Sequence, residues 1–319
     1  MTLRSLKLAL RLTLGACALA LLGAQPASAQ APATNAPPAG TARVAPPAGF
    51  RMPDPTEGRK KVLFIGDLQT GVSVAHDWSM SHAVAVLERL GRETGAFDLY
   101  VQTDTHLITK AQTSGGGDRM PGRSLPGRNL DYFDAVVFYT NGETEMTDAQ
   151  KKDLLAFVHD DGKGFVGIHT ATATLYQWPE YGEMIGAYFD NHPWNVIEAP
   201  VIVEEPSFPA MKGYATGARI KDEMYAFKAP YSRDKVDVLA RLDPRALDLA
   251  NKAVHRTDGD FPIAWIKSYG QGRVFYSGLG HPVSSWDDPR MQQMYVEAIK
   301  WVLRETPGEP RPHPMTPAP

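Results

Sequence analysis

Short apolar segments alternate with helical patterns through the middle of the chain, and this alternation restricts the fold more than any other feature. Residues 61–66 form a short apolar run bounded by charge and glycine, which is typical of a buried strand. Residues 80–90 then carry apolar side chains at helical spacing, and the pattern ends at Gly91. Strands that are joined through helices pair in parallel, with right-handed crossovers. The sequence therefore predicts an α/β fold with a mostly parallel sheet.

The rest of the middle segment follows the same pattern. Thr147 and Gln150 form a capping box that begins a helix, and Gly162 follows its end. The polar, glycine-rich residues 111–130 are expected to form a long surface loop. The remaining strands are predicted at 98–102, 135–139, 165–168, 196–203, 236–242, 262–267 and 273–276, and a last amphipathic helix at 291–303.

The first 29 residues have the three parts of a secretory signal. Arg4 and Lys7 supply the positive end, residues 12–22 the apolar segment, and residues 27–29 (ASA) the cleavage site. The apolar segment is too short to cross a bilayer as a stable helix. It continues beyond Cys17, which favours simple cleavage over a lipid anchor at that cysteine. We therefore expect an exported protein, periplasmic or secreted, with residues 1–29 as its signal peptide.

Both ends of the mature chain are rich in proline. Residues 30–58 combine Pro, Ala and Thr without apolar periodicity, and residues 306–319 repeat this composition. Such segments do not bury enough apolar surface to fold alone. We expect a disordered linker at 30–58, a single folded domain at 59–305 and a disordered tail at 306–319.

Composition excludes several classes of function. Cys17 is the only cysteine, so removal of the signal leaves no thiol for a disulfide, a metal or a covalent intermediate. The formal net charge of −3 gives no electrostatic basis for binding nucleic acid or an anionic membrane. We expect a small molecule as the partner, with no membrane contact after signal cleavage, and the sequence does not determine the oligomeric state.

Histidines follow three of the predicted strands. His169 comes directly after the strand at 165–168, His281 follows the strand at 273–276, and His76 lies in the loop after the first strand. The carboxyl ends of parallel strands meet at one edge of a sheet, where ligands bind. These three imidazoles are therefore expected to share one crevice, and His192 can join them from a nearby loop.

These histidines allow two kinds of chemistry. His169, His192 and His281 with the carboxylate of Glu223 would suit zinc or another divalent ion, which binds neutral imidazole and ionised carboxylate. The sequence has no short-range ligand motif such as H-E-x-x-H to support this assignment. The alternative is metal-free proton transfer by His169 and His281, because imidazole titrates near neutral pH.

Aromatic and polar side chains near these histidines suggest a sugar as the ligand. A sugar ring offers flat C–H faces to aromatic rings and hydroxyl groups to polar side chains, and the sequence places Trp178 and Trp194 in loops where they can line a pocket. Tyr225, Asp260 and His76 are further candidates for substrate contacts. The glycine-rich segments match neither a phosphate-binding loop nor a dinucleotide fingerprint.

Six motifs in order resemble the trehalose-utilisation (ThuA-like) family, from about Lys61 to about Leu303. They are GIH at 167–169, WPEY at 178–181, GAYFDNHP at 186–193, DEMYAF at 222–227, PIAW at 262–265 and GRVFYSGLGH at 272–281. The chain departs from the family at Phe261, where relatives often have histidine, and at Met224, where they often have tryptophan.

The resemblance implies a flavodoxin-like, class I glutamine amidotransferase-like three-layer sandwich. It implies that His169 occupies the position of the amidotransferase cysteine and that His281 lies at or near the position of its catalytic histidine. The amidotransferase sequence His-Pro-Glu is replaced by HPV at 281–283, so the nucleophile and the acidic residue are both missing. Glutaminase activity is therefore not expected.

The resemblance also implies a role in the catabolism of trehalose and related disaccharides through oxidised (3-keto) sugars. We expect an exported, carbohydrate-active protein that uses a histidine-based site, either with a divalent metal such as zinc or without one. As an enzyme it would be a hydrolase, a lyase or an isomerase. The alternative is a non-catalytic sugar-binding module that has kept the fold and lost its chemistry.

Overall fold

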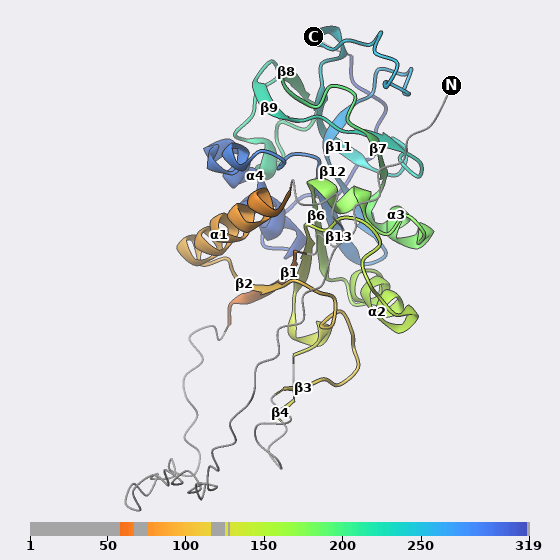
Figure 1. Cartoon of the computed structure of the whole chain (residues 1–319). Helices are drawn as coiled ribbons and strands as arrows, with labels where there is room; N and C mark the ends of the chain where they lie inside the picture. Colours follow the sequence, from red (N-terminus) through yellow and green to blue (C-terminus); the bar gives the residue numbers. More distant parts are fainter. Residues whose placement is uncertain (1–57, 67–75, 116–124, 127, 318–319) are drawn as a thin grey trace, which may run out of the picture. The chain divides into compact units, whose positions relative to one another are not determined.

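The computed structural model describes residues 58–66, 76–115, 125–126 and 128–317 (Figure 1). The predicted signal peptide at 1–29 and nearly all of the predicted linker lie outside these residues. In the part of the chain that is described, none of the helices combines the length and the apolar character that a membrane span requires.

A nine-stranded sheet forms the centre of the domain, in the order β2-β1-β5-β6-β13-β12-β11-β8-β9. The first five strands of this order pair in parallel, and the others extend the sheet with antiparallel pairs. The parallel strands are β1 (Lys60–Ile65), β2 (Phe97–Gln102), β5 (Ala135–Phe138), β6 (Gly164–Ile168) and β13 (Gly272–Ser277). The antiparallel strands are β8 (Val196–Val203), β9 (Arg219–Glu223), β11 (Asp237–Leu242) and β12 (Pro262–Tyr269).

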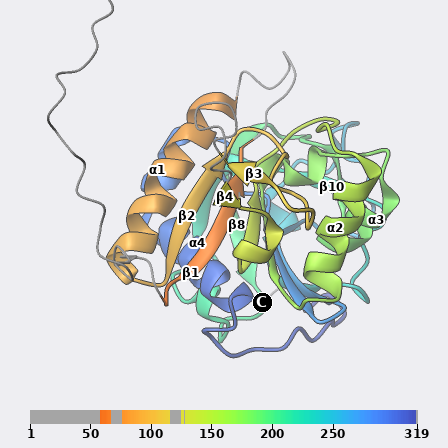
Figure 2. The ribbon, with the colours of Figure 1, turned by 90° about the horizontal axis from the view of Figure 1, so that it is seen from below.

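Helices cover both faces of the parallel half of the sheet. Helices α1 (Asp77–Thr94) and α4 (Pro289–Val302) lie on one face, and α2 (Asp148–His159) and α3 (Pro179–Ile185) lie on the other (Figures 1 and 2). Successive residues of a strand point to opposite faces. Phe64 of β1 therefore packs in the core beneath α1 and α4, while its neighbour Leu63 packs in the core beneath α2 and α3. The predicted three-layer α/β sandwich is confirmed.

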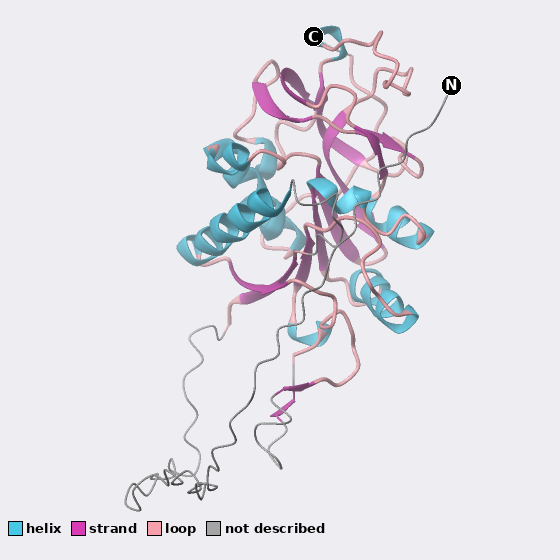
Figure 3. Cartoon of the chain, viewed as in Figure 1, coloured by secondary structure: helices cyan, strands magenta, loops and turns pink. Residues whose placement is uncertain are grey.

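Several predicted elements are present at nearly the predicted bounds. The capping box of Thr147 and Gln150 begins α2, and α4 begins two residues earlier than predicted, at Pro289, behind its cap Asp288. The loop expected at 111–130 contains two short paired strands, β3 (Ser114–Gly115) and β4 (Leu125–Pro126). The sequence patterns did not predict β9 or the small sheet of β7 (Tyr188–Asn191) and β10 (Ala226–Lys228) (Figure 3).

Residues 306–317 contain neither helix nor strand, and yet they are bound to the domain. The Arg273 guanidinium donates to the carbonyl of Thr306 and pairs with Glu309, and Arg241 donates to the carbonyl of Thr316. The composition of residues 306–319, which predicts a disordered tail, gave no indication of these contacts. Proline removes backbone donors but leaves carbonyl acceptors, and two buried arginines of the sheet need such acceptors.

A candidate metal centre at the strand ends

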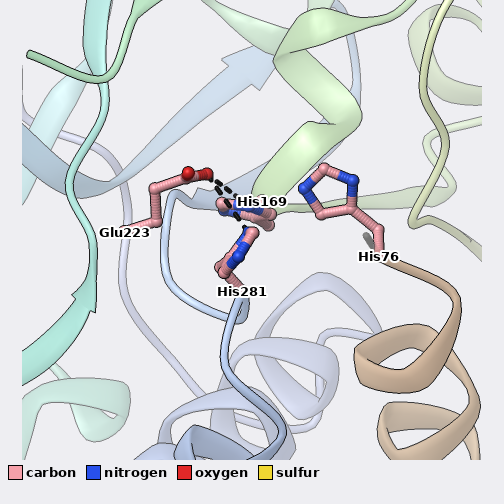
Figure 4. A group of neighbouring side chains, drawn as sticks. All are labelled: His76, His169, Glu223 and His281. Carbon is pink, nitrogen blue, oxygen red and sulfur yellow. Dashed lines mark ion pairs between the residues drawn. The ribbon is translucent and has the colours of Figure 1, made fainter. Parts of the chain in front are cut away.

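Four side chains converge where the parallel strands end. His76 precedes α1 in the connection after β1, His169 directly follows β6, and His281 lies shortly after β13 (Figure 4). Glu223 is the last residue of the antiparallel edge strand β9. The carboxyl edge of a parallel sheet collects loop residues from distant parts of the chain. This edge therefore brings three imidazoles and one carboxylate together, as the strand-end pattern predicted for the histidines.

The four side chains are close enough to bind one ion. One potential ligand atom from each residue lies within 4.8 Å of the others. Oε2 of Glu223 is 3.4 Å from Nε2 of His169 and 3.2 Å from Nδ1 of His281. The ring of His76 lies 5.3 Å from that of His169 and 4.9 Å from that of His281, between ring centroids.

The backbone and ring of His169 are held in one orientation. Its φ of 45° is in the left-handed region, which is unfavourable for a residue with a Cβ atom. The hydroxyl of Tyr276 donates to the carbonyl of His169 at 2.7 Å, and Nδ1 of His169 donates to the carbonyl of Gly278 at 2.7 Å. Gly167 has no room for a side chain, because a Cβ there would lie 2.8 Å from Ile185. The contact at Nδ1 leaves Nε2, which lies 3.4 Å from Oε2 of Glu223, as the ring nitrogen that faces the cluster, as in histidines that bind metals.

Tyr225 adds a hydroxyl group beside this nitrogen. Its Oη lies 2.9 Å from Nε2 of His169, and the two rings stack at 4.3 Å. Burial, with a further contribution from Glu223, raises the pKa of Tyr225 well above its ordinary value. Tyr225 therefore keeps its proton and acts as a hydrogen-bond donor.

Asp222 fixes the backbone that carries two of the four side chains. Its buried carboxylate accepts hydrogen bonds from the backbone N–H groups of Glu223, Gly280 and His281, at 2.8 to 3.0 Å. Burial raises the pKa of Asp222, while these N–H groups and His169 favour its charged form. Asp222 thus acts on the cluster through the backbone, by holding Glu223 and His281 in position.

His76 and Glu223 have the protonation states that metal binding requires. Burial and the neighbouring His169 and His281 lower the pKa of His76 to about 4. Burial alone would raise the pKa of Glu223, but its contacts with His169 and His281 outweigh burial and hold the pKa below its usual range. The contact with Glu223 raises the pKa of His281. A neutral imidazole beside an ionised carboxylate is the donor set that divalent transition metals bind.

Several polar atoms of the cluster are buried without a partner. Among the described residues, both ring nitrogens of His76 and Nδ1 of His281 have no hydrogen-bond partner. Buried polar atoms in native proteins are nearly always paired with protein, water or an ion. The Glu223 and His281 side chains keep 11% and 22% of their surface exposed, so the cluster is open on that side.

Three of the four predicted metal ligands lie together in the structure, and a different histidine takes the place of the fourth. His169, Glu223 and His281 are together as expected, but His76, which we expected to contact substrate, is the fourth member of the cluster. His192 lies at its rim, with Nε2 4.0 Å from Oε1 of Glu223 and 46% of the side chain exposed. His192 follows β7, and the strand patterns had not identified this strand.

Three residues predicted to contact substrate have other neighbours. Trp178 stacks on Tyr181 and lines a separate cleft of about 600 Å³ along α2. Trp194 packs edge-to-face on Phe261 in the core. The carboxylate of Asp260 pairs with Arg233 at 2.6 Å and accepts from the hydroxyl of Tyr231. Tyr225 alone of the predicted aromatic and acidic contacts touches the cluster.

The sequence patterns missed the supporting roles of Tyr276 and Asp222. Tyr276 lies in the strand predicted at 273–276, and nothing in that pattern indicates that its hydroxyl is hydrogen-bonded to the carbonyl of His169. Asp222 lies beside Glu223 in the motif at 222–227, and no pattern in the sequence assigns it a role of its own. A charged side chain at a buried position of a strand indicates a specific role, but this signal was hidden because the sequence patterns did not predict β9.

Comparisons with known proteins agree with this architecture. A protein described as ThuA-like from Bacteroides uniformis ATCC 8492 has 23% sequence identity and a TM-score of 0.60, and the match covers 76% of this chain and 91% of that one. A second protein described in the same way, from Parabacteroides merdae ATCC 43184, has 20% identity and a TM-score of 0.57 over 77% of this chain and 91% of its own. At these identities the likeness shows a common fold. No curated protein matched the sequence.

The family profile "ThuA: Trehalose utilisation" matches residues 68–302, which include His76, His169, Glu223 and His281. This match spans most of the chain, and it agrees with the six motifs noted in the sequence. The chain therefore belongs to the ThuA family.

Proposed function

We propose that this protein is an exported, metal-dependent enzyme that acts on a disaccharide or its oxidised (3-keto) derivative. The observation that carries the proposal is the cluster of His76, His169, Glu223 and His281, whose ligand atoms lie within 4.8 Å of one another. The description of the family as one of trehalose utilisation supports a sugar substrate.

The composition of the cluster favours some ions over others. Four protein ligands would close a tetrahedral zinc site, whereas catalytic zinc sites keep one position open. A six-coordinate divalent ion with mixed nitrogen and oxygen ligands keeps positions open beside the same four side chains. Zinc binding would therefore favour a structural role, and an ion such as Mn²⁺ would favour catalysis.

A 3-keto sugar has chemistry that this cluster can assist. A divalent ion held there would supply a Lewis acid for the carbonyl oxygen of the substrate. A base then removes the proton from the carbon beside the carbonyl, and the electron pair moves to the carbonyl oxygen. Returning the proton to a different carbon completes an isomerisation. Breaking the C–O bond to the neighbouring glycosidic oxygen, with transfer of the proton from the base to that oxygen, completes an elimination.

His192 is the residue that we assign as the base. Its imidazole lies near Glu223 but outside the four-residue cluster, and nearly half of its side chain is exposed to solvent and hence to a substrate. Tyr225 keeps its proton and can donate a hydrogen bond to a substrate oxygen bound beside Nε2 of His169. Binding, polarisation and proton transfer are thus assigned to different side chains.

The test is solvent exchange at the carbon beside the carbonyl. Metal-loaded protein is incubated with 3-keto-trehalose in D₂O, and incorporation of deuterium is followed by NMR. We expect exchange with the wild type, loss of metal and exchange with His169→Ala, and loss of exchange but not of metal with His192→Gln. His255→Ala, an exposed histidine paired with Asp190, is the control and should behave as the wild type.

Substrate binding without exchange in the metal-loaded wild type would reject the enzyme and favour a binding module. Release of ammonia from glutamine should not occur, because the mature chain would lack a thiol.

Export is the other part of the proposal. It is supported by the charged end, the apolar segment and the cleavage motif within residues 1–29. Cell fractionation and sequencing of the mature N-terminus test it. We expect a periplasmic or secreted protein that begins after Ala29, and recovery of the uncut chain in the cytoplasm would contradict export.

A further inference from the structure

A second group of potential ligands lies where the C-terminal segment crosses the antiparallel half of the sheet. Glu205 follows β8 closely, Asp237 is the first residue of β11, and His313 belongs to the segment predicted to be a disordered tail. Nε2 of His313 is 3.6 Å from Oε1 of Glu205 and 3.6 Å from Oδ1 of Asp237. One imidazole and two carboxylates from three distant parts of the chain thus face a common point.

The ligand atoms of Asp237 and His313 are free, while their other polar atoms are occupied. Oδ2 of Asp237 accepts the backbone N–H of Arg311 at 2.7 Å, and Nδ1 of His313 donates to the carbonyl of Pro314 at 2.7 Å. Within the described ranges of the chain, Oδ1 of Asp237 and Nε2 of His313 are buried and have no hydrogen-bond partner. Asp237 is only 3% exposed, so water does not readily satisfy its free oxygen.

The distances between these atoms are those of ligands rather than of hydrogen-bonded partners. At 3.6 Å, nitrogen and oxygen are too far apart for a hydrogen bond. Metal–ligand bonds of about 2.0–2.2 Å place two ligands of a tetrahedral ion roughly 3.3–3.6 Å apart. The hydrogen bond at Nδ1 also fixes the tautomer with a lone pair on Nε2, as the outer contacts of metal-binding histidines do.

The local charge favours a cation. Glu204, the neighbour of Glu205, is already neutralised by Arg233 and Arg241 at 2.6 Å each. Burial and the nearby Asp237 raise the pKa of Glu205, and burial raises the pKa of Asp237, in part opposed by the N–H of Arg311.

We propose that Glu205, Asp237 and His313 bind a divalent transition-metal ion, with Zn²⁺ the best match to one imidazole and two carboxylates. By binding both His313 and Asp237, the ion links the C-terminal segment to β11. Glu205 is partly exposed, which leaves room for water as the fourth ligand. This site is structural and is independent of the cluster at the ends of the parallel strands.

The test counts zinc ions by competition with a chromophoric chelator. We expect the wild type to bind one zinc more than His313→Ala, and Asp237→Asn to weaken the same site by at least the roughly 10–100-fold that loss of an outer contact costs. His255→Ala is again the control, because its imidazole contacts a carboxylate in an exposed ion pair. Thermal melting in chelator should show that all variants fold.

Hydrogen exchange provides a second readout at the proposed fastening point. Zinc should slow exchange of the Arg311 amide, which donates to Asp237, in the wild type and not in His313→Ala. An unchanged zinc count in His313→Ala would overturn the proposal and leave His313 as a protonated partner of the carboxylates. His169→Ala should lose the other zinc equivalent, so failure of one site is distinguishable from failure of the other.

Discussion

Nδ1 of His281 lies 3.2 Å from Oε2 of Glu223, yet among the described residues this buried nitrogen has no partner with hydrogen-bond geometry. The two atoms are close but not directed at each other. Glu223 also lies 3.4 Å from Nε2 of His169, a nitrogen that the hydroxyl of Tyr225 contacts at 2.9 Å. Atoms that share a common ion are arranged in this way, because each is directed at the ion between them. This relation is the basis of the proposed metal centre.

Asp222→Asn should weaken metal binding without removing a ligand. The amide offers one acceptor oxygen in place of two and turns N–H groups toward the backbone N–H donors of Glu223, Gly280 and His281. We expect metal affinity to fall roughly 10–100-fold and the free energy of unfolding to fall by about 1–3 kcal/mol. Metal titration and urea unfolding measure the two effects. A variant with wild-type affinity would show that Asp222 does not position the cluster.

Metal uptake should weaken as the pH falls. The contact with Glu223 raises the pKa of His281 in the metal-free protein, so a proton competes with the ion at higher pH than for an ordinary histidine. The pKa of His76 is lowered to about 4, so His76 remains neutral between pH 5 and 8. Affinity should therefore decrease as the pH falls from somewhat above 6.5. Affinity that is constant between pH 5 and 8 would contradict a site that contains His281.

Gly167→Ala should destabilise the protein, whereas Gly278→Ala should not. A Cβ at 167 would lie 2.8 Å from Ile185 and 2.9 Å from Tyr276, so the side chain that holds His169 must move. A Cβ at 278 would meet Phe227 at 3.5 Å, an ordinary contact. We expect a loss of about 1–3 kcal/mol for the first variant and under about 0.5 kcal/mol for the second, measured by chemical unfolding. Equal stability of the two variants would contradict the tight packing under β6.

Lys267→Met should stabilise the protein near neutral pH. Burial lowers the pKa of Lys267 from 10.5 to about 8, although its ammonium donates to the carbonyl of Glu183. At pH 7 the folded state therefore holds a charge that water would solvate better. We expect a gain of about 1–2 kcal/mol in the free energy of unfolding, after loss of that hydrogen bond. Lys235→Met, which removes an exposed ion pair to the same Glu183, should change stability by under about 0.5 kcal/mol.

The sign of the pH effect provides a further check on Lys267. Between pH 8 and 10.5 the unfolded chain binds the proton more strongly than the folded one, so the free energy of unfolding rises with pH in this window. The penalty is complete below pH 8 and disappears above 10.5. The advantage of Lys267→Met should therefore shrink as the pH rises from 8. An advantage that grows with pH would contradict a lowered pKa.

The sequence predicts the parallel half of the fold well and the other half less well. Residues 60–65 and 164–168 are short apolar runs, which are distinctive because both of their faces are buried. Strand β9 has the sequence RIKDE and is recognisable only through its pairing with β8. The position of residues 306–317 against the domain depends on hydrogen bonds that Arg241 and Arg273 donate to carbonyl groups of this segment. No local sequence pattern reveals these bonds.

The candidate site was predictable to the extent that strand ends determine it. His76, His169 and His281 follow parallel strands, so their convergence follows from the topology alone. Glu223 reaches the same place from an antiparallel edge strand, and its position depends on register and on the contacts of Asp222. The cluster contains His76 in place of the predicted His192. This difference depends on distances of a few ångströms, which sequence spacing does not determine.

The most direct test of the central claim is anomalous X-ray scattering from crystals grown with Zn²⁺ or Mn²⁺ and measured at the absorption edge of the metal. We predict a peak bounded by the imidazoles of His76, His169 and His281 and the carboxylate of Glu223, and its absence from crystals of Glu223→Gln. Wild-type crystals grown with either metal that show no anomalous peak at that point, but only water or hydrogen bonds between the side chains, would contradict the account.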